Sequence, residues 1–329
     1  MMQQTDKNSV NVVFANAKAP VVPKSFHSNT KDSSSSSMAV QKQYFTLNTG
    51  QKMPMVGLGT YRIHGQSVIY RVIEAGLKAG YRAFDTAAVY RNEEAIGLAL
   101  KTLLPKFSLS REDIFLTTKL DPSDHGKGTT TKAVKDSLKK LGTSYLDLYL
   151  IHWPGVSRLP VHSPDNALIR SNTWHELVSL HRQGVLRAIG ISNYTVQHLK
   201  ELIKNSHGVI PAVNQVEYHP HYKQPELLKL CQDKGVLLQA YCSLGGSSDR
   251  RLLEDATVGI VAKKLCRSPA QILLRWALQQ GIGVIPKSVS PDHVSDNMKL
   301  DFIIPDSDMN ALNNIPIVEK YAWDPTPVV

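Results

Sequence analysis

The stretch Asp85-Thr86-Ala87-Ala88-Val89-Tyr90 decides how the rest of the sequence is interpreted. It follows the apolar-leaning run Tyr81 to Phe84, which predicts a short buried strand, so that Asp85 falls where the strand ends and Tyr90 lies in the loop beyond it. A carboxylate on a strand and a phenol on the next loop can face one pocket. A free phenol titrates near about 10, and a neighbouring cation lowers that value. Tyrosine proton transfer near neutral pH therefore needs a positive partner.

Two later strand ends supply candidates for that partner. The apolar run Ile114 to Thr118 leads directly into Lys119, and the run Leu146 to Ile151 leads into His152. In a barrel of alternating strands and helices, residues at the carboxyl ends of the strands converge on one face. The sequence therefore predicts one group of ionisable side chains, made up of Asp85, Tyr90, Lys119 and His152.

Short apolar runs alternate with longer amphipathic runs along the whole chain, which predicts an α/β protein with a (β/α)8 TIM barrel. The predicted strands cover residues 57–60, 82–86, 114–118, 146–151, 187–191, 212–216, 237–240 and 283–286. The predicted helices cover 67–79, 92–104, 129–141, 171–183, 195–204, 225–234 and 269–280. Between a helix and the next strand stand glycines of the kind that end helices, namely Gly80, Gly142, Gly184, Gly235 and Gly281. An open doubly wound sheet is the alternative, but Gly57 to Arg62 lacks the third glycine of the GxGxxG fingerprint.

The N-terminal part of the chain differs from this pattern. Residues 1–37 are polar, show no periodicity and end in Ser33 to Ser37, which predicts a disordered Ser-rich extension before a barrel domain over residues 38–329. A mitochondrial transit peptide is the alternative, and the lack of arginine and the two aspartates in the extension disfavour it. Residues 43–55 then predict a β-hairpin with a glycine in its turn.

Composition limits the classes of protein to consider. The chain has 329 residues, of which 42% are hydrophobic and 20% charged, as in a soluble globular protein, and no apolar run is long enough to cross a bilayer. The net charge of +10 comes from lysines and arginines spread along the chain, so a phosphate-bearing cofactor explains it better than nucleic acid. Three widely spaced cysteines, Cys231, Cys242 and Cys266, are expected to be small buried residues in a reducing, cytoplasmic compartment, and they form no metal-ligand pattern.

Several motifs in fixed order resemble those of the aldo-keto reductase superfamily, over a stretch from about Tyr44 to about Pro325. They are Gly57 to Tyr61, Asp85 to Tyr90, Ile151 to Pro154, Gly190 to Tyr194, Asn214 to Pro220 and Ile285 to Ser288. The resemblance implies a barrel closed at its bottom by the hairpin, and a monomer that reduces aldehydes and ketones to alcohols with NADPH, without a metal. It also implies that Tyr90 is the general acid, that Lys119 biases its phenol towards ionisation, that Asp85 holds Lys119, and that His152 orients the carbonyl group.

The resemblance further implies a set of cofactor contacts. Ser192, Asn193 and Gln215 match residues that bind the nicotinamide carboxamide, Tyr241 matches an aromatic that stacks on the ring, and Lys287 and Ser288 match residues that hold the 2′-phosphate. The implied cofactor-binding set also includes Thr60, Tyr61, Leu244, His293 and Asn297. The implied substrate-binding residues are His152, Trp153 and Tyr61.

Some positions depart from the pattern of the superfamily. Tyr61 stands where many relatives have tryptophan, and His293 stands where relatives often have an arginine that pairs with the 2′-phosphate, so the preference for NADPH is expected to be weaker. Cys242 replaces a serine, and Gly245-Gly246 suggests a short clasp over the pyrophosphate. Only Thr326 to Val329 follow the family-like tail, which predicts an open substrate site.

Each of these residues taken singly also fits a structural role. Asp85 and Lys119 can form an ordinary ion pair, His152 can be a core histidine, and Ser192 and Asn193 can cap a helix. A non-catalytic barrel that binds a nucleotide, such as a channel subunit or a structural protein, is therefore the alternative to the enzyme. The four ionisable residues at matching positions favour the enzyme.

Overall fold

The computed structural model describes residues 44–246 and 249–329. The predicted Ser-rich extension, residues 1–37, lies outside the described residues, as do residues 38–43, where the predicted barrel domain begins. No helix in the described part of the chain is both long enough and apolar enough to cross a bilayer.

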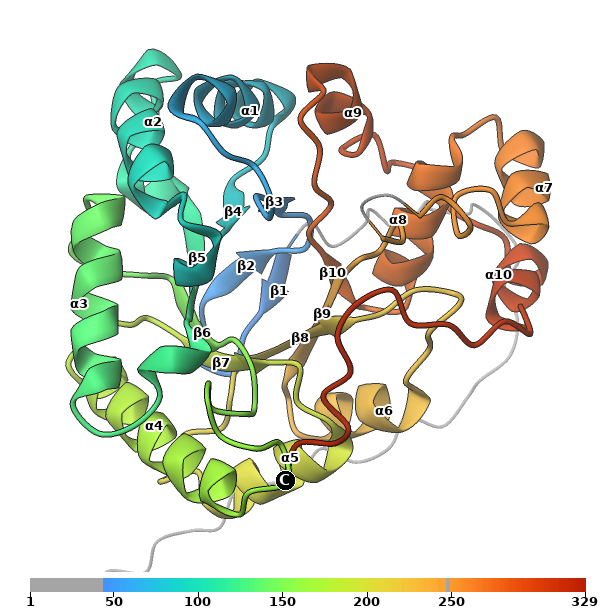
Figure 1. Cartoon of the computed structure of the whole chain (residues 1–329). Coiled ribbons are helices and arrows are strands. Elements are labelled where there is room, and N and C mark those ends of the chain that lie inside the picture. The colour runs from blue at the N-terminus through green and yellow to red at the C-terminus, as the bar shows by residue number, and fades with distance from the viewer. Residues whose placement is uncertain (1–43, 247–248) are drawn as a thin grey trace, which may run out of the picture. The chain divides into compact units, whose positions relative to one another are not determined.

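Eight parallel strands form one sheet in the order β10-β9-β8-β7-β6-β5-β4-β3, so strands adjacent in sequence are adjacent in space. Their bounds are β3 Leu58–Gly59, β4 Ala83–Asp85, β5 Phe115–Leu120, β6 Leu148–Ile151, β7 Ile189–Ser192, β8 Val213–Glu217, β9 Leu237–Tyr241 and β10 Gly283–Val284. A parallel bridge between Val56 and Val284 joins the two edges, and Gly57 N donates to Val284 O over 2.9 Å. The predicted (β/α)8 barrel is confirmed (Figure 1).

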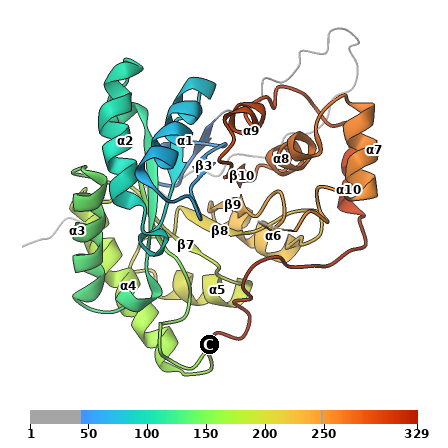
Figure 2. The same ribbon diagram turned by 45° about the horizontal axis from the view of Figure 1, so that its top comes forward.

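The helices surround these strands in both ribbon views (Figures 1 and 2). Their bounds are α1 Gln66–Ala79, α2 Glu93–Lys106, α3 Thr129–Leu141, α4 Asp165–Arg182, α5 Val196–Lys204, α6 Pro225–Asp233, α7 Ala256–Lys264, α8 Pro269–Gln279, α9 Pro291–Asp296 and α10 Asp306–Asn313, with short 3-10 helices η1 Ala88–Tyr90, η2 Arg111–Asp113 and η3 Pro122–Asp124. The five predicted helix-ending glycines all have positive φ, between 65° and 96°. A glycine reaches this left-handed conformation without a Cβ penalty, which is why it ends the helices.

The sequence prediction missed three helices and misplaced some boundaries. The missed helices, α7, α9 and α10, carried start signals, since Asp255 accepts from Thr257 N and Val258 N at the start of α7 and a proline stands at the start of α9. Helix α4 begins at Asp165, six residues before the predicted start, because Asn166 bonds to the preceding loop through Val156 N and Pro160 O. Lys119 lies inside β5 and not after it.

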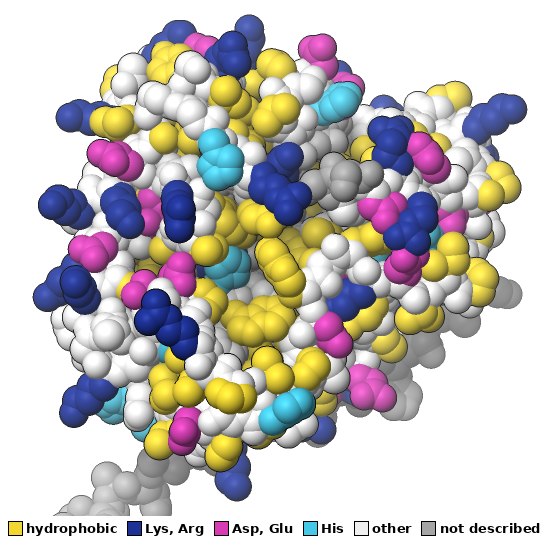
Figure 3. Space-filling model, in the orientation of Figure 1, with side chains coloured by type: hydrophobic (Ala, Val, Ile, Leu, Met, Phe, Trp, Pro, Cys, Tyr) yellow, Lys and Arg dark blue, Asp and Glu magenta, His cyan; other side chains and the backbone are white. Residues whose placement is uncertain are grey.

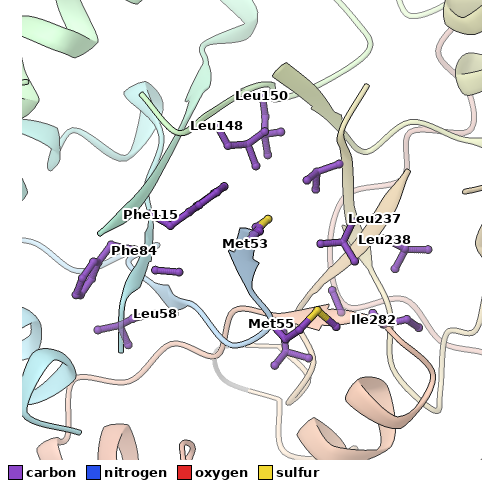
Figure 4. Packing of buried hydrophobic residues seen from close by; sticks show 14 of the residues in the cluster. Met53, Met55, Leu58, Phe84, Phe115, Leu148, Leu150, Leu237, Leu238 and Ile282 are labelled. Carbon is purple, nitrogen blue, oxygen red and sulfur yellow. The ribbon is translucent and has the colours of Figure 1, made fainter. Parts of the chain in front are cut away.

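The hairpin of β1 (Tyr44–Thr46) and β2 (Lys52–Pro54) lies at the amino ends of the barrel strands. Asn48 Nδ2 donates to Pro211 O over 3.1 Å, and Gln51 Nε2 approaches Asp147 Oδ1 at 3.5 Å, just before β8 and β6 begin. Met53 is 1% exposed and points into the barrel, together with Met55, Phe115 and Leu148 (Figure 4). Because its apolar side chain fills that end, the hairpin closes the bottom and the opposite, carboxyl face stays available for chemistry.

The cysteines follow the prediction only in part. Cys231 is buried and Cys242 is half-buried, but Cys266 is exposed, which corrects the expectation that all three are buried. Cys266 follows α7 with a φ of 51°, so its backbone turns the chain out of the helix and its side chain faces the surface.

Candidate active site

Three predicted site residues meet at the carboxyl ends of β4 and β5. Asp85, the last residue of β4, accepts a hydrogen bond from Lys119 Nζ at 2.5 Å, and Lys119 Nζ also donates to Thr86 O at 2.9 Å. The same ammonium lies 3.5 Å from the hydroxyl of Tyr90, at the end of η1. Lys119 is fully buried and Asp85 nearly so. A buried charge of this kind is stable only when it is paired, which fixes the cation beside the phenol.

Burial has the largest effect on the pKa values of Tyr90 and Lys119. It raises the pKa of the Tyr90 hydroxyl well above its usual value, and the negative charge of Asp85 acts in the same direction. Burial also lowers the pKa of the Lys119 ammonium, although the adjacent Asp85 opposes this effect. The phenol is therefore protonated at neutral pH. The influence of Lys119 on the phenol stays a prediction, since burial has the largest effect on the pKa of Tyr90 and a cation 3.5 Å away would act in the opposite direction.

His152, the fourth residue of the predicted group, directly follows β6. Its ring lies edge-on to that of Tyr90, with the ring centroids 5.5 Å apart. Burial lowers the pKa of His152 to about 3, and the charge of Lys119 adds to this effect. A neutral imidazole can orient a carbonyl oxygen by a hydrogen bond, but it does not act as an acid at neutral pH.

A second layer of polar side chains connects this group to β7, β8 and β9. Gln215 Nε2 donates to Asp85 Oδ2 and to Gln239 Oε1, both at 2.8 Å, and Ser192 Oγ donates to Gln215 O at 2.7 Å. Asn193 has a φ of 64°, which asparagine tolerates, and donates to His152 O while accepting from Tyr241 OH at 2.6 Å. The structure therefore brings together the side chains predicted to contact the nicotinamide.

These side chains fit a carboxamide on an aromatic ring. The two protons of the Gln215 amide are used by Asp85 and Gln239, so its carbonyl oxygen is the atom oriented to accept from another amide. The ring of Tyr241 is half-buried at the end of β9 and is held by its bond to Asn193. The amide oxygen of Gln215, the hydroxyl of Ser192 and the fixed ring of Tyr241 are the kinds of group that bind a nicotinamide.

Thr60 and Lys287, two of the residues predicted to bind the rest of the cofactor, lie at the β3 and β10 side of the barrel. Thr60 is buried and bonds through Oγ1 to Asp85 O at 2.8 Å. A Cβ added to Gly59 would lie 3.6 Å from the Cβ of Lys287, so Lys287 stands beside the end of β3. Lys287 is exposed and forms no ion pair within residues 44–246 and 249–329. Among the described residues, this exposed cation has no carboxylate partner.

The remaining predicted contacts are more dispersed. Ser288 Oγ accepts from Ser290 N at 3.1 Å, His293 is exposed on α9, and Asn297 is buried at the C-terminal end of that helix. Leu244 is half-buried against the core. The predicted pyrophosphate clasp includes residues 247–248, which lie outside the described residues. The structure shows no contact that joins Leu244, Ser288 or His293 to the group around Tyr90.

The ring of Tyr61 packs against Tyr90, and the ring of Trp323 packs against Tyr61. The ring centroid of Tyr61 is 5.0 Å from that of Tyr90 and 6.2 Å from that of Trp323. Trp153 is half-buried, and its carbonyl oxygen bonds to His125 at 3.1 Å, but no contact between its ring and Tyr90 is among those of the described residues. The space-filling view shows hydrophobic side chains and a histidine in a hollow over the centre of the barrel (Figure 3).

Two residues of this region were missed by the sequence analysis. Trp323 was noted only as part of a family-like tail, and Glu217, within a quoted motif, received no role. Glu217 is buried at the end of β8 and bonds to Lys320, Tyr321 and Ala322. The available signal was a carboxylate at the end of a predicted buried strand, since a buried carboxylate needs partners from elsewhere in the chain.

Comparisons with known proteins identify the family of the chain. The model of the "Aldo/keto reductase family" matches residues 55–316. Glyoxal reductase of Bacillus subtilis is 36% identical over 285 residues, which cover 86% of this chain and 96% of that protein. Glycerol 2-dehydrogenase (NADP(+)) of Saccharomyces cerevisiae is 36% identical over 288 residues, covering 82% of this chain and 89% of the yeast protein.

Solved structures are similar over the same part of the chain. An aldo/keto reductase from Brucella melitensis has 40% sequence identity and a TM-score of 0.73, with 82% of this chain and 98% of that chain covered. The apo form of Gox0644 has 33% identity and a TM-score of 0.76, covering 88% and 98% of the two chains. The chain therefore belongs to the aldo/keto reductase family, a family of oxidoreductases that generally use nicotinamide cofactors.

Proposed function

We propose that this protein reduces aldehydes and ketones to the corresponding alcohols with NADPH, and that Tyr90 is the general acid. The observation that carries the proposal is the group formed by Tyr90, Lys119 and Asp85, in which a protonated phenol lies 3.5 Å from a buried ammonium held by a carboxylate. Few structural roles require an unexposed lysine beside a tyrosine hydroxyl at the open end of a barrel.

The chemistry of these side chains follows from their protonation. A bound nicotinamide cofactor supplies the hydride to the carbonyl carbon. The Tyr90 hydroxyl donates its proton to the carbonyl oxygen, which becomes the alcohol, and the Lys119 ammonium stabilises the tyrosinate that remains. Neutral His152 donates a hydrogen bond that orients the carbonyl oxygen. Asp85 holds the ammonium in place and is itself held by Gln215.

Binding of the cofactor is assigned to two sets of residues. Ser192, Asn193, Gln215 and Tyr241 would hold the nicotinamide, and Thr60, Tyr61, Leu244, Lys287, Ser288, His293 and Asn297 would contact the remainder. The choice of NADPH rests on Lys287, a rim cation without a protein partner among the described residues, because a 2′-phosphate requires such a cation. The name of the yeast relative, which includes NADP(+), agrees with this choice.

For the substrate, we propose a small-molecule carbonyl compound that contacts His152, Trp153 and Tyr61. The Bacillus relative is named for glyoxal, which makes glyoxal the first compound to test. We also propose that the protein acts as a monomer in the cytoplasm. The three free cysteines fit a reducing compartment, and light scattering of the purified protein tests its mass.

The experiment is NADPH oxidation by purified protein with glyoxal and an aromatic aldehyde, in parallel with Tyr90→Phe. We expect Tyr90→Phe to lower kcat by about 100-fold or more, the size of a general-acid effect, and to leave the Kd for NADPH unchanged. Tyr44→Phe is the matched control, since it removes a hydroxyl from the hairpin at the opposite end of the barrel. Tight NADPH binding without turnover of any aldehyde would contradict the proposal and favour a nucleotide-binding barrel without catalysis.

A further inference from the structure

Asn92 stands between the two loops that carry Tyr61 and Tyr90. It immediately precedes helix α2, and its side chain is buried, with the residue 2% exposed. An asparagine in this position usually caps the helix, because its side-chain oxygen accepts from a backbone N–H of the first turn. Asn92 makes no such bond. Helix capping therefore does not account for the burial of this amide.

The amide of Asn92 bonds to the loop after β3 and to the loop after β4. Its Nδ2 donates to Thr60 O at 3.0 Å and to Ile63 O at 3.1 Å, and its Oδ1 accepts from Thr86 Oγ1 at 2.5 Å. Because the two carbonyl oxygens can only accept, they fix which end of the amide faces them. Both amide protons are used in this way. One side chain thus joins the first residue after β3 to the first residue after β4.

The bonds from Asn92 hold a turn that contains Tyr61. Ile63 N donates to Thr60 O at 3.1 Å, which closes a turn over residues 60–63, and Asn92 bonds to the carbonyl oxygen at each end of it. Arg62, the third residue of the turn, has a φ of 59°, a conformation that glycine usually takes in this position. A turn strained at a bulky residue persists only when its surroundings hold it. The buried amide of Asn92 supplies that support.

The same amide restrains the segment that carries Tyr90. Asn92 lies two residues after Tyr90, and Arg91 between them has a φ of 55°. Thr86, which bonds to Asn92, lies four residues before Tyr90. The backbone on both sides of Tyr90 is therefore tied to the amide that also holds the turn of Tyr61. Because the ring centroids of the two tyrosines are 5.0 Å apart, this amide controls how the rings pack.

We propose that Asn92 is a positioning residue that holds the ring of Tyr61 against Tyr90, so that the carbonyl substrate can contact both side chains. The proposal rests on the proposed function, in which Tyr61 contacts the substrate and Tyr90 protonates it. Asn92 touches neither substrate nor cofactor in this account. It acts through the backbone of residues 60–63 and 86–92. The alternative is a set of bonds that contributes to stability alone.

The first test measures kcat and KM for benzaldehyde at saturating NADPH. Asn92→Ala is expected to raise KM about 5-fold, the size of one aromatic contact, and to leave kcat largely unchanged, because the Tyr90 hydroxyl keeps Lys119 beside it. Bonds that only stabilised the fold would change the amount of active protein, and with it kcat, but not KM. Tyr61→Ala should raise KM to a similar extent. The double variant should resemble Tyr61→Ala, because both changes act on one contact.

A milder pair of variants keeps the test decisive if Asn92→Ala does not fold. Thr86→Val removes the hydroxyl that donates to Asn92 Oδ1 and preserves the shape of the side chain, whereas Thr86→Ser keeps the hydroxyl. We expect Thr86→Val to raise KM about 3-fold, the size of one hydrogen bond, and Thr86→Ser to retain the wild-type KM. Asn48→Ala is the matched control, since Asn48 Nδ2 also donates to two carbonyl oxygens, of Ile210 and Pro211, but at the opposite end of the barrel. It should retain both constants.

Limited trypsin digestion measures the same restraint without turnover. Arg62 is exposed and is followed by Ile63, which is 1% exposed, so that trypsin reaches the bond between them only when the turn opens. Asn92→Ala is expected to speed cleavage after Arg62 severalfold, as measured by mass spectrometry. Arg158 is the internal standard in the same digest, because it is exposed, has a φ of 70° and lies in a different loop, between β6 and α4. Cleavage after Arg158 should keep its wild-type rate.

Asn166→Ala is the matched control for the digestion. Asn166 is also a buried asparagine, and its Nδ2 donates to Pro160 O at 2.9 Å while its Oδ1 accepts from Val156 N at 2.9 Å, so that it holds the loop of Arg158. This variant should speed cleavage after Arg158 and leave cleavage after Arg62 unchanged. The two asparagines then give opposite patterns, whereas a general loss of stability would speed both cleavages in either variant.

Each outcome decides between positioning and stability alone. An unchanged KM in Asn92→Ala and Thr86→Val would overturn the proposal, and so would equal acceleration of the cleavages after Arg62 and Arg158 in Asn92→Ala. If Asn92→Ala does not fold, KM and digestion of Thr86→Val decide. A wild-type protein that reduces no aldehyde contradicts the proposed function and with it the role of Asn92 in the reaction. The digestion experiment then still decides whether Asn92 holds the turn.

Discussion

The two halves of the proposed cofactor and substrate site hold their charges in opposite ways. On the β4 and β5 side, Lys119 and Asp85 are buried and bonded to each other at 2.5 Å. On the β10 and α9 side, Lys287 and His293 are exposed, and neither forms an ion pair among the described residues. A buried pair is costly to break because each partner leaves an uncompensated charge, whereas an exposed cation is screened by water and salt. The first half should therefore control stability and catalysis, and the second only the choice of cofactor.

The strongest test of this difference is Lys119→Met. It leaves the Asp85 carboxylate buried without its cation, and the unfolding free energy is expected to fall by about 3–5 kcal/mol. Urea denaturation followed by circular dichroism measures it. Lys229→Met, which breaks an exposed pair with Asp233, is the matched control and should change little. Equal losses of unfolding free energy in the two variants would mean that the buried pair contributes no more to stability than the exposed pair.

A smaller effect is expected from His152 when the pH is lowered. Its pKa is about 3 in the folded protein, and it returns to its usual value when the chain unfolds, so below that value the unfolded state binds the proton that the folded state excludes. The contribution of His152 to stability is therefore lost as the pH falls from about 6.5 towards 3, amounting to about 2 kcal/mol between about pH 7 and pH 5.

His152→Gln tests this by urea denaturation at both pH values. Between about pH 7 and pH 5, the unfolding free energy of the variant should fall by about 2 kcal/mol less than that of the wild type. His175→Gln, at an exposed histidine on α4, should follow the wild type. If His152→Gln and the wild type lose stability in parallel, the imidazole is not held neutral by burial.

The smallest expected effect concerns the exposed half. Lys287→Ala should raise the Kd for NADPH about 10-fold and leave the Kd for NADH unchanged, because one charge-assisted contact to the 2′-phosphate is lost. His293→Arg should increase the preference for NADPH, since arginine is always charged and can bind phosphate through two hydrogen bonds. Fluorescence titration with both cofactors measures these constants. Lys52→Ala, in the hairpin, is the control, and an equal change for NADH would show that Lys287 does not contact the 2′-phosphate.

Local patterns in the sequence were sufficient to predict the barrel and the proximity of the ionisable residues around Tyr90. Strand and helix periods, and glycines such as Gly80 and Gly142, depend on neighbours in the chain, and their conformations follow from backbone sterics. Because strand ends of a parallel barrel share one face, the positions of Asp85, Lys119 and His152 at successive ends already implied their proximity.

The protonation of these residues and the path of the C-terminal residues 319–329 depended on tertiary structure. Burial raises the pKa of Tyr90 well above its usual value, and the residues near Tyr90 in sequence do not reveal that burial. Glu217 and Lys320 are 103 residues apart, so their contact exists only once the barrel has closed. The sequence by itself thus determined the fold and the kind of chemistry, because both arise from local patterns. The tertiary structure decided which groups are buried and which distant side chains they contact, because burial and long-range contacts are properties of the folded chain.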